Sequence, residues 1–91
     1  MPIAFDPTKR DRTLLERGLD MARAEEIFAG PTVTVTDDRR DYGETRYITV
    51  GFLDGRMVFV AWTRRSRVRR IISPRKANDR EQKLYGPRFR R

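Results

Sequence analysis

The chain has 91 residues, enough for one domain with its own hydrophobic core but too few to enclose a deep substrate cavity. It contains no cysteine and no histidine, which excludes disulfides and thiolate zinc sites and removes the commonest general base. No apolar run approaches the roughly 20 residues of a membrane span, and the N-terminus has no signal-peptide pattern. We therefore expect a cytoplasmic protein.

The net charge of +8 is concentrated in the second half of the chain. Residues 1–54 carry 8 basic and 11 acidic side chains, a balance of −3, whereas residues 55–91 carry 13 basic and 2 acidic ones, a balance of +11. This asymmetry indicates a polyanionic partner for the C-terminal half. A membrane surface fits less well, because the basic segment has the pattern of strands and not of an amphipathic helix.

In chain order, the first third predicts a short strand and two helices. Residues 2–5 have the pattern of an edge strand. Asp6, followed by proline, is a typical N-cap, and Gly18 is a typical left-handed helix end. Asp20 caps a second helix over residues 21–28, whose apolar side chains recur at helical spacing and predict core packing.

The pattern then changes to the alternation of strands. Residues 32–36 direct their valines inward, and residues 46–53 direct Ile48, Val50 and Phe52 inward, which leaves Tyr47 and Thr49 on the opposite face. Between these strands lies a polar loop whose aspartates, at positions 37, 38 and 41, stand beside two arginines. The arginines would repel a cation, so the loop predicts a solvated connection and not a metal site.

Two more strands and a final helix follow. Asp54-Gly55 is a hairpin signal, and the strands at residues 57–63 and 68–73 pair across a tight turn, with Pro74 ending the second. Trp62 is expected in the core. Asn78 and the glutamate three residues later form a capping box that opens a helix over residues 79–85.

The predicted order is therefore β-α-α-β-β-β-β-α. Four consecutive strands with short connections predict an antiparallel meander, and the helices are expected to cover one face of it in a two-layer α+β fold. We expect one domain over residues 1–87, followed by a basic tail at residues 88–91. The uncovered face of the sheet is the expected functional surface.

Arginines crowd the turn between the last two strands, at positions 64, 65, 67, 69 and 70. Since strand side chains alternate, Arg67 and Arg69 should share one face with Ile71, and Arg75 should extend the same line. Such a row of guanidinium groups favours phosphate binding. The alternative is an inert, solvated basic face.

Several motifs occur together in an order typical of one family. The first three are an aromatic-Asp-x-x-Lys segment at residues 5–9, a Gly-apolar-x-apolar helix entry at residues 18–21, and Gly-Glu-x-Arg-aromatic at residues 43–47. The fourth is a C-terminal block that consists of Thr63, Arg65, Arg-Ile-Ile-Ser-x-Arg-x-Ala at residues 70–77, Glu81 and Tyr85. Together they resemble the BrnT family of type II toxins, which are similar in fold to RelE-type ribonucleases. The chain departs from the family pattern at Glu16-Arg17, where Lys-His is frequent, at Phe5, where Trp is commoner, and at Pro74.

The resemblance implies a RelE-like toxin that cleaves RNA and inhibits translation. It also implies neutralisation by a BrnA-like ribbon-helix-helix antitoxin, in a heterotetramer of two toxins joined through an antitoxin dimer. Operator DNA would be bound only through the antitoxin. No membrane partner is implied.

RNA carries its own nucleophile, the 2′-OH, so the enzyme needs only to align it, move protons and stabilise charge on the phosphate. Arginine cannot lose its proton at working pH, but it can clamp a phosphate. We expect four residues to be catalytic: Arg65, Arg67, Arg75 and Glu81. Glu81 is equally explained by the capping box. Without metal ligands or a cofactor, cleavage should be metal-independent.

Further RNA contacts are expected from Arg64, Arg69, Arg70, Lys76, Tyr47, Tyr85 and Lys9. Lys76, Tyr85 and Lys9 are also candidates for proton transfer. Arg70 has the parity of Val68, and that face could lie against the helices, so Arg70 ranks below the other arginines as an RNA contact. Tyr85 could pack on the sheet instead of stacking on a base. Two other functions use the same arginines: a non-catalytic nucleic-acid-binding module and a basic protein-interaction domain.

Overall fold

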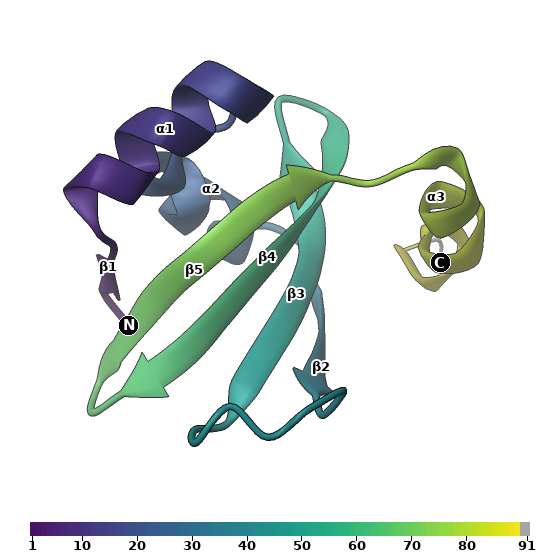
Figure 1. Cartoon of the computed structure of the whole chain (residues 1–91). Helices are drawn as coiled ribbons and strands as arrows, with labels where there is room; N and C mark the ends of the chain where they lie inside the picture. Colours follow the sequence, from purple (N-terminus) through teal and green to yellow (C-terminus); the bar gives the residue numbers. More distant parts are fainter. Residues whose placement is uncertain (90–91) are drawn as a thin grey trace.

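A computed structural model describes residues 1–89. Within this range five strands form one sheet in the order β1-β5-β4-β3-β2. The strands are β1 (Ile3–Ala4), β2 (Val33–Asp37), β3 (Arg46–Leu53), β4 (Arg56–Arg65) and β5 (Val68–Lys76). β1 pairs parallel to β5, and β2 to β5 form an antiparallel meander (Figure 1).

Three α-helices accompany the sheet in the described residues: α1 (Pro7–Arg17), α2 (Ala24–Ala29) and α3 (Asp79–Tyr85). A 3₁₀ turn, η1 (Met21–Arg23), leads into α2, and another, η2 (Gly86–Phe89), follows α3. The predicted α+β class and meander are confirmed. The expected tail begins inside η2, and its last two residues, 90 and 91, lie outside the described part. No helix within residues 1–89 is long and apolar enough to cross a membrane.

Local sequence signals set the ends of these elements as expected. Asp6 accepts hydrogen bonds from the first turn of α1, and Gly18 ends that helix in the left-handed region at φ 69°. The β3–β4 hairpin turns at Asp54 and Gly55, both at positive φ, as a tight hairpin requires. The capping box that opens α3 is complete, with both of its reciprocal hydrogen bonds formed.

One face of the sheet packs against η1 and α2. Val58, Val60 and Trp62 of β4 meet Met21 and Ile27 there, all of them buried. As expected, Trp62 lies in the core. Its Nε1–H donates a 2.8 Å hydrogen bond to the hydroxyl of buried Thr49. The same hydroxyl forms a second hydrogen bond, also of 2.8 Å, with the hydroxyl of Thr34 on β2.

The last helix lies over the opposite face, so the helices do not all cover one side. Tyr85 of α3 packs edge-on against Phe59 at 5.3 Å between ring centroids, and Phe89 of η2 packs against Phe52 at 4.9 Å. Ile48, Val50 and Phe52 therefore face α3, whereas Tyr47 and Thr49 lie under α2, the reverse of the expected assignment. Both faces of β3 are apolar enough to be covered, and alternation alone does not say which helix covers which face.

A β-bulge interrupts the pairing of β4 with β5. Ala61 pairs with Ser73 but Trp62 pairs with Ile71, so Ile72 is an extra residue on β5. Side chains before the bulge therefore change faces relative to those after it. The prediction that Arg67, Arg69 and Arg75 share a face is wrong: Arg67 lies in the turn, and Arg69 lies on the α2 side.

The prediction that Pro74 ends the strand is also wrong, because β5 continues to Lys76. Proline is tolerated in a strand where its missing N–H faces an edge. β1 covers only Arg69 and Arg70, so β5 is an edge strand at Pro74. The Pro74 carbonyl accepts a 2.9 Å hydrogen bond from Arg17 Nη1 at the end of α1.

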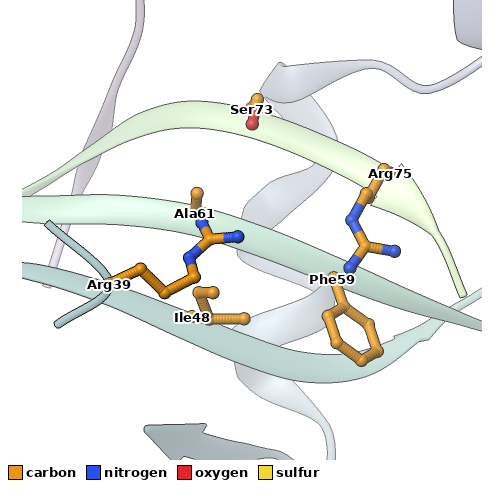
Figure 2. A pocket seen from close by; sticks show the side chains of 6 residues that line it. All are labelled: Arg39, Ile48, Phe59, Ala61, Ser73 and Arg75. Carbon is orange, nitrogen blue, oxygen red and sulfur yellow. The ribbon is translucent and has the colours of Figure 1, made fainter. Parts of the chain in front are cut away.

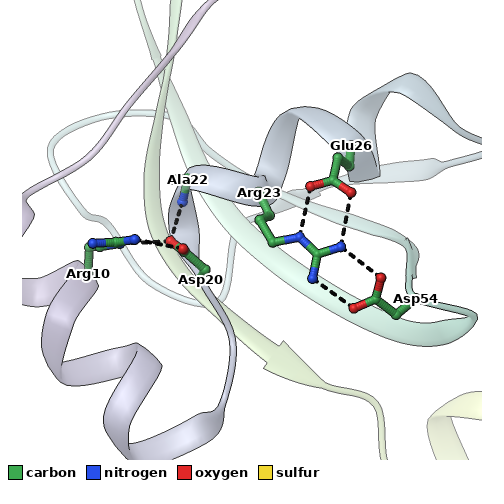
Figure 3. Close-up of polar contacts among 6 residues, drawn as sticks. All are labelled: Arg10, Asp20, Ala22, Arg23, Glu26 and Asp54. Carbon is green, nitrogen blue, oxygen red and sulfur yellow. Dashed lines mark hydrogen bonds and ion pairs between the residues drawn. The ribbon is translucent and has the colours of Figure 1, made fainter.

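Ion pairs tie the helical segments together (Figure 3). Arg10 of α1 donates two hydrogen bonds, of 2.8 and 2.7 Å, to Asp20 before η1. Arg23 bonds both Glu26 of α2 and Asp54 of the hairpin. Hydrogen bonds from Arg10 lower the pKa of Asp20 to about 2, so this carboxylate is charged at neutral pH.

Candidate nucleic-acid interface

On the face of the sheet that points away from α2, α3 covers one part and the rest is not covered by a helix of the described part of the chain. We call it the open face; its side chains come from β3, β4, β5 and the loop after β2, and include Arg39, Arg46, Ala61, Thr63, Arg70, Ser73 and Arg75. A shallow cavity of about 90 Å³ on this face is lined by Arg39, Ile48, Phe59, Ala61, Ser73 and Arg75 (Figure 2). Small side chains at positions 61 and 73 leave room above the sheet, and two guanidinium groups border that room.

Arg75 is held in one orientation by two neighbours. Its Nη1 and Nη2 donate hydrogen bonds of 2.7 and 2.6 Å to the two carboxylate oxygens of Glu81 on α3. Its guanidinium lies over the Phe59 ring, 4.5 Å from the centroid. The hydrogen bonds to Glu81 raise the pKa of Arg75, so this side chain stays charged where it borders the cavity.

Glu81 is itself fully engaged by Arg75 and by the backbone. One of its oxygens also accepts a 3.0 Å hydrogen bond from the Asn78 N–H in the capping box. The bonds from Arg75 lower the pKa of Glu81 to about 2. A carboxylate with so low a pKa is a weak proton acceptor at neutral pH, so in this arrangement Glu81 positions Arg75.

Arg39 reaches the same cavity from the loop after β2. Its Nε and Nη2 donate hydrogen bonds of 2.7 and 2.8 Å to Asp37, the last residue of β2, which is buried. These bonds lower the pKa of Asp37 to about 2. Asp37 is thus committed to Arg39, and no group of three or more acidic residues within residues 1–89 is arranged to hold a metal ion.

Arg46 and Arg70 form a second basic group, which crosses the open face along one line of paired strand residues. Arg46 of β3 pairs with Thr63 of β4, which pairs with Arg70 of β5. The Arg46 guanidinium lies 3.9 Å from the centroid of the Tyr42 ring, and its buried Nε has no hydrogen-bond partner among the described residues, since Glu44 is 3.6 Å away. Guanidinium groups carry N–H donors of the kind that bind phosphate.

Lys9 of α1 adds its charge to this group. Partial burial lowers its pKa, and so do the positive charges of Arg46, Arg17 and Arg70, against the opposite effect of Asp6. Arg46 and Arg70 belong to the open face, so Lys9 lies near the charges of that face.

The arginines of the β4–β5 turn lie far from the cavity. Arg64, Arg65 and Arg67 are exposed around the turn at Ser66 and Arg67. Arg65 is six residues along β4 from Phe59, the partner of Arg75, which places it about 20 Å away. These side chains cannot act on the same phosphorus as Arg75, but they can contact neighbouring phosphates.

Three other expected RNA contacts lie on the α2 side of the sheet. Tyr47 stacks on Trp62 with ring centroids 4.7 Å apart. Arg69 lies over the Phe28 ring at 4.0 Å. Lys76 approaches Gly18 beyond α1. Tyr85, by contrast, lies on the same side as the cavity, although its ring packs on the sheet.

Comparison with protein families matches residues 5–81 to the family described as ribonuclease toxin, BrnT, of type II toxin-antitoxin system. The chain belongs to the BrnT family. It is thus a ribonuclease toxin of a type II toxin–antitoxin system, for which RNA is the substrate and a cognate antitoxin the partner. No curated protein sequence matches it.

The BrnT match spans every element that builds the cavity. It includes the loop that carries Arg39, all of β3 to β5 with Arg46, Arg70 and Arg75, and α3 as far as Glu81. Of the motif residues that indicate the family, Ser73 and Arg75 line the cavity and Arg46 and Arg70 lie on the open face, whereas Met21 and Tyr47 pack on the α2 side.

Two basic residues of the BrnT site did not emerge from the sequence as site residues. The polar loop that carries Arg39 predicts only a solvated connection, and no local signal distinguishes this residue, since its place beside Ala61 and Ser73 arises only in the folded chain. Arg46 lies inside the Gly-Glu-x-Arg-aromatic motif and alternates with Ile48. Knowing the register of β3 against β4 would have placed it on the open face.

Proposed function

We propose that this cytoplasmic toxin cleaves RNA by metal-independent attack of a 2′-OH on the adjacent phosphorus, with the scissile phosphate held on the open face. The observation that carries the proposal is the pair of guanidinium groups, from Arg39 and Arg75, that border a cavity floored by Ala61 and Ser73 (Figure 2). A phosphodiester is small, anionic and rich in acceptors, which matches such a pair.

In this reaction the 2′-oxygen bonds to phosphorus while the bond from phosphorus to the 5′-oxygen breaks. The products are a 2′,3′-cyclic phosphate and a 5′-hydroxyl. Negative charge grows on the phosphoryl oxygens in the transition state, and fixed guanidinium donors stabilise it without further reorganisation. Glu81 contributes by holding Arg75 in place.

Flanking phosphates would be bound by the second basic group and by the arginines of the β4–β5 turn. For about five contacts to single-stranded RNA, log affinity should fall against log salt with a slope near −3.5, at about −0.7 per contact. A slope near zero would show that this face does not bind RNA through its charges, and it would favour a protein-interaction domain.

Cleavage is tested with Arg75→Ala, and with Arg56→Ala as the matched control. Arg56 is an exposed arginine at the first position of β4, and its parity places it on the α2 side of the sheet, away from the cavity. Loss of one transition-state donor should lower the cleavage rate about 100- to 1,000-fold, while the control should cleave normally and EDTA should have no effect. Binding without a cyclic-phosphate product would instead identify a non-catalytic module.

We further propose that a BrnA-like ribbon-helix-helix antitoxin neutralises the toxin by covering the open face, in a heterotetramer built on an antitoxin dimer that alone contacts operator DNA. The +11 balance of residues 55–91 supports an acidic covering segment, which it would attract rapidly. Hydrogen exchange of the co-expressed complex should show protection around Arg70 and Arg75. If these residues stay as accessible as in the free toxin, inhibition does not act by occlusion.

A further inference from the structure

Lys9 occupies a defined place beside the open face because α1 runs next to β5 in the same direction (Figure 1). Lys9, Thr13 and Arg17 are four residues apart and share one stripe of the helix. Thr13 is buried, and Arg17 donates a hydrogen bond to the Pro74 carbonyl, so this stripe faces β5.

Distances along the two elements place Lys9 level with Arg70. Eight helical residues, from Arg17 back to Lys9, span about 12 Å. Four strand residues, from Pro74 back to Arg70, span about 13 Å. The electrostatic neighbours agree with this register, because Arg46 and Arg70 of the open face are among the charges that act on Lys9.

We propose, building on the proposed cleavage of RNA, that Lys9 is the general acid that protonates the departing 5′-oxygen. Among the basic residues of the open face it is the one whose proton can leave, since arginine stays protonated at working pH. Its place at the edge of the face, opposite Arg75 and Glu81 across the cavity floor, fits a leaving group that departs on the side away from them.

The 2′-oxygen forms its bond to phosphorus and releases its proton to water. The bond from phosphorus to the 5′-oxygen breaks, the electron pair stays on that oxygen, and the Lys9 ammonium transfers a proton to it. The neutral amine then takes a proton from water. The lowered pKa of Lys9 makes this transfer easier, because a stronger acid donates more readily to the same oxygen.

The test uses Lys9→Arg, which keeps the charge but cannot donate a proton, with Lys83→Arg on exposed α3 as the matched control. Two RNA substrates are compared: an ordinary one, and one with sulfur in place of the scissile 5′-oxygen. A thiolate leaves without protonation, since thiols have a pKa of about 8.5. Lys9→Arg should cleave ordinary RNA about 100-fold or more slowly, should cleave the sulfur substrate nearly as fast as the unmodified chain, and should bind RNA with an unchanged salt slope.

Equal slowing on both substrates, or no slowing on either, would overturn the role of Lys9 as a general acid. In both cases, cyclic-phosphate products from the unmodified chain would leave the proposed function standing. If the unmodified chain cleaves neither substrate, the proposed function fails and the role of Lys9 with it. Because Lys9 is exposed and arginine keeps its charge, Lys9→Arg should fold normally, which a thermal melt checks.

Discussion

Adjacent arginines on opposite faces of β5 offer the sharpest test of the site. The bulge at Ile72 places Arg70 on the open face, in line with Thr63 and Arg46, and places Arg69 under α2. Replacing each by alanine removes the same side chain from neighbouring positions of one strand. We expect the two variants to fail in different ways.

Arg70→Ala should impair function and spare stability. Loss of one contact to a flanking phosphate makes the salt slope of RNA binding shallower by about 0.7, and with toxin below saturation it slows cleavage in proportion to the weaker binding. Arg69→Ala should do the reverse, because Arg69 lies 4.0 Å from the Phe28 centroid and 5.2 Å from that of Trp62. Two such contacts contribute about 1–2 kcal/mol to stability, and each kcal/mol corresponds to roughly 4–8 °C in Tm for a domain of this size.

The assay pairs thermal unfolding with single-turnover cleavage of a short labelled RNA, at a temperature where both variants are folded. Normal cleavage by Arg69→Ala with a lowered Tm, and slow cleavage by Arg70→Ala with an unchanged Tm, would support the assignment. The opposite pattern would show that the strand alternates regularly through Ile72. In that case the open face would have to be redrawn.

Three further variants probe the framework around the site. Thr49→Val should destabilise the fold by about 1–3 kcal/mol in chemical denaturation, because it leaves the buried Trp62 N–H without an acceptor; no change would mean that this N–H finds another partner. Gly51→Ala should cost about 1–3 kcal/mol by overpacking, since its Cβ would lie 2.7 Å from an isoleucine of α2, whereas Gly86→Ala meets nothing within 4 Å and should be nearly neutral. The pKa of Asp20 is lower folded than unfolded, so its contribution to stability is complete above the unfolded value of 3.8 and is lost as pH falls toward 2. Asp20→Asn should therefore be less stable than the unmodified chain at pH 7, and its Tm should fall less between pH 5 and pH 2. If the Tm of the variant falls as much as that of the unmodified chain, other carboxylates cause the acid sensitivity.

The sequence by itself determined the order of the elements and most of their ends, although not the end of β5, which runs past Pro74. Asp6, Gly18 and the Asp54-Gly55 pair act through backbone conformation and hydrogen bonds within a few residues, so their effects can be read locally. The capping box of α3 is of the same kind. Alternation and helical spacing likewise predicted the α+β class and the meander, because period depends only on neighbours along the chain.

Only the tertiary structure decided which side chains meet. The bulge at Ile72 exchanged the faces of Arg69 and Arg70, and nothing within β5 marks that residue as the one that bulges. Arg39 joined Arg75 over one cavity although 36 positions separate them in the sequence. The arginines of the turn were separated from that cavity by the length of β4. A site assembled from a loop, three strands and two helices depends on register and packing between distant segments, and those are set by the whole chain and not by any one stretch of it.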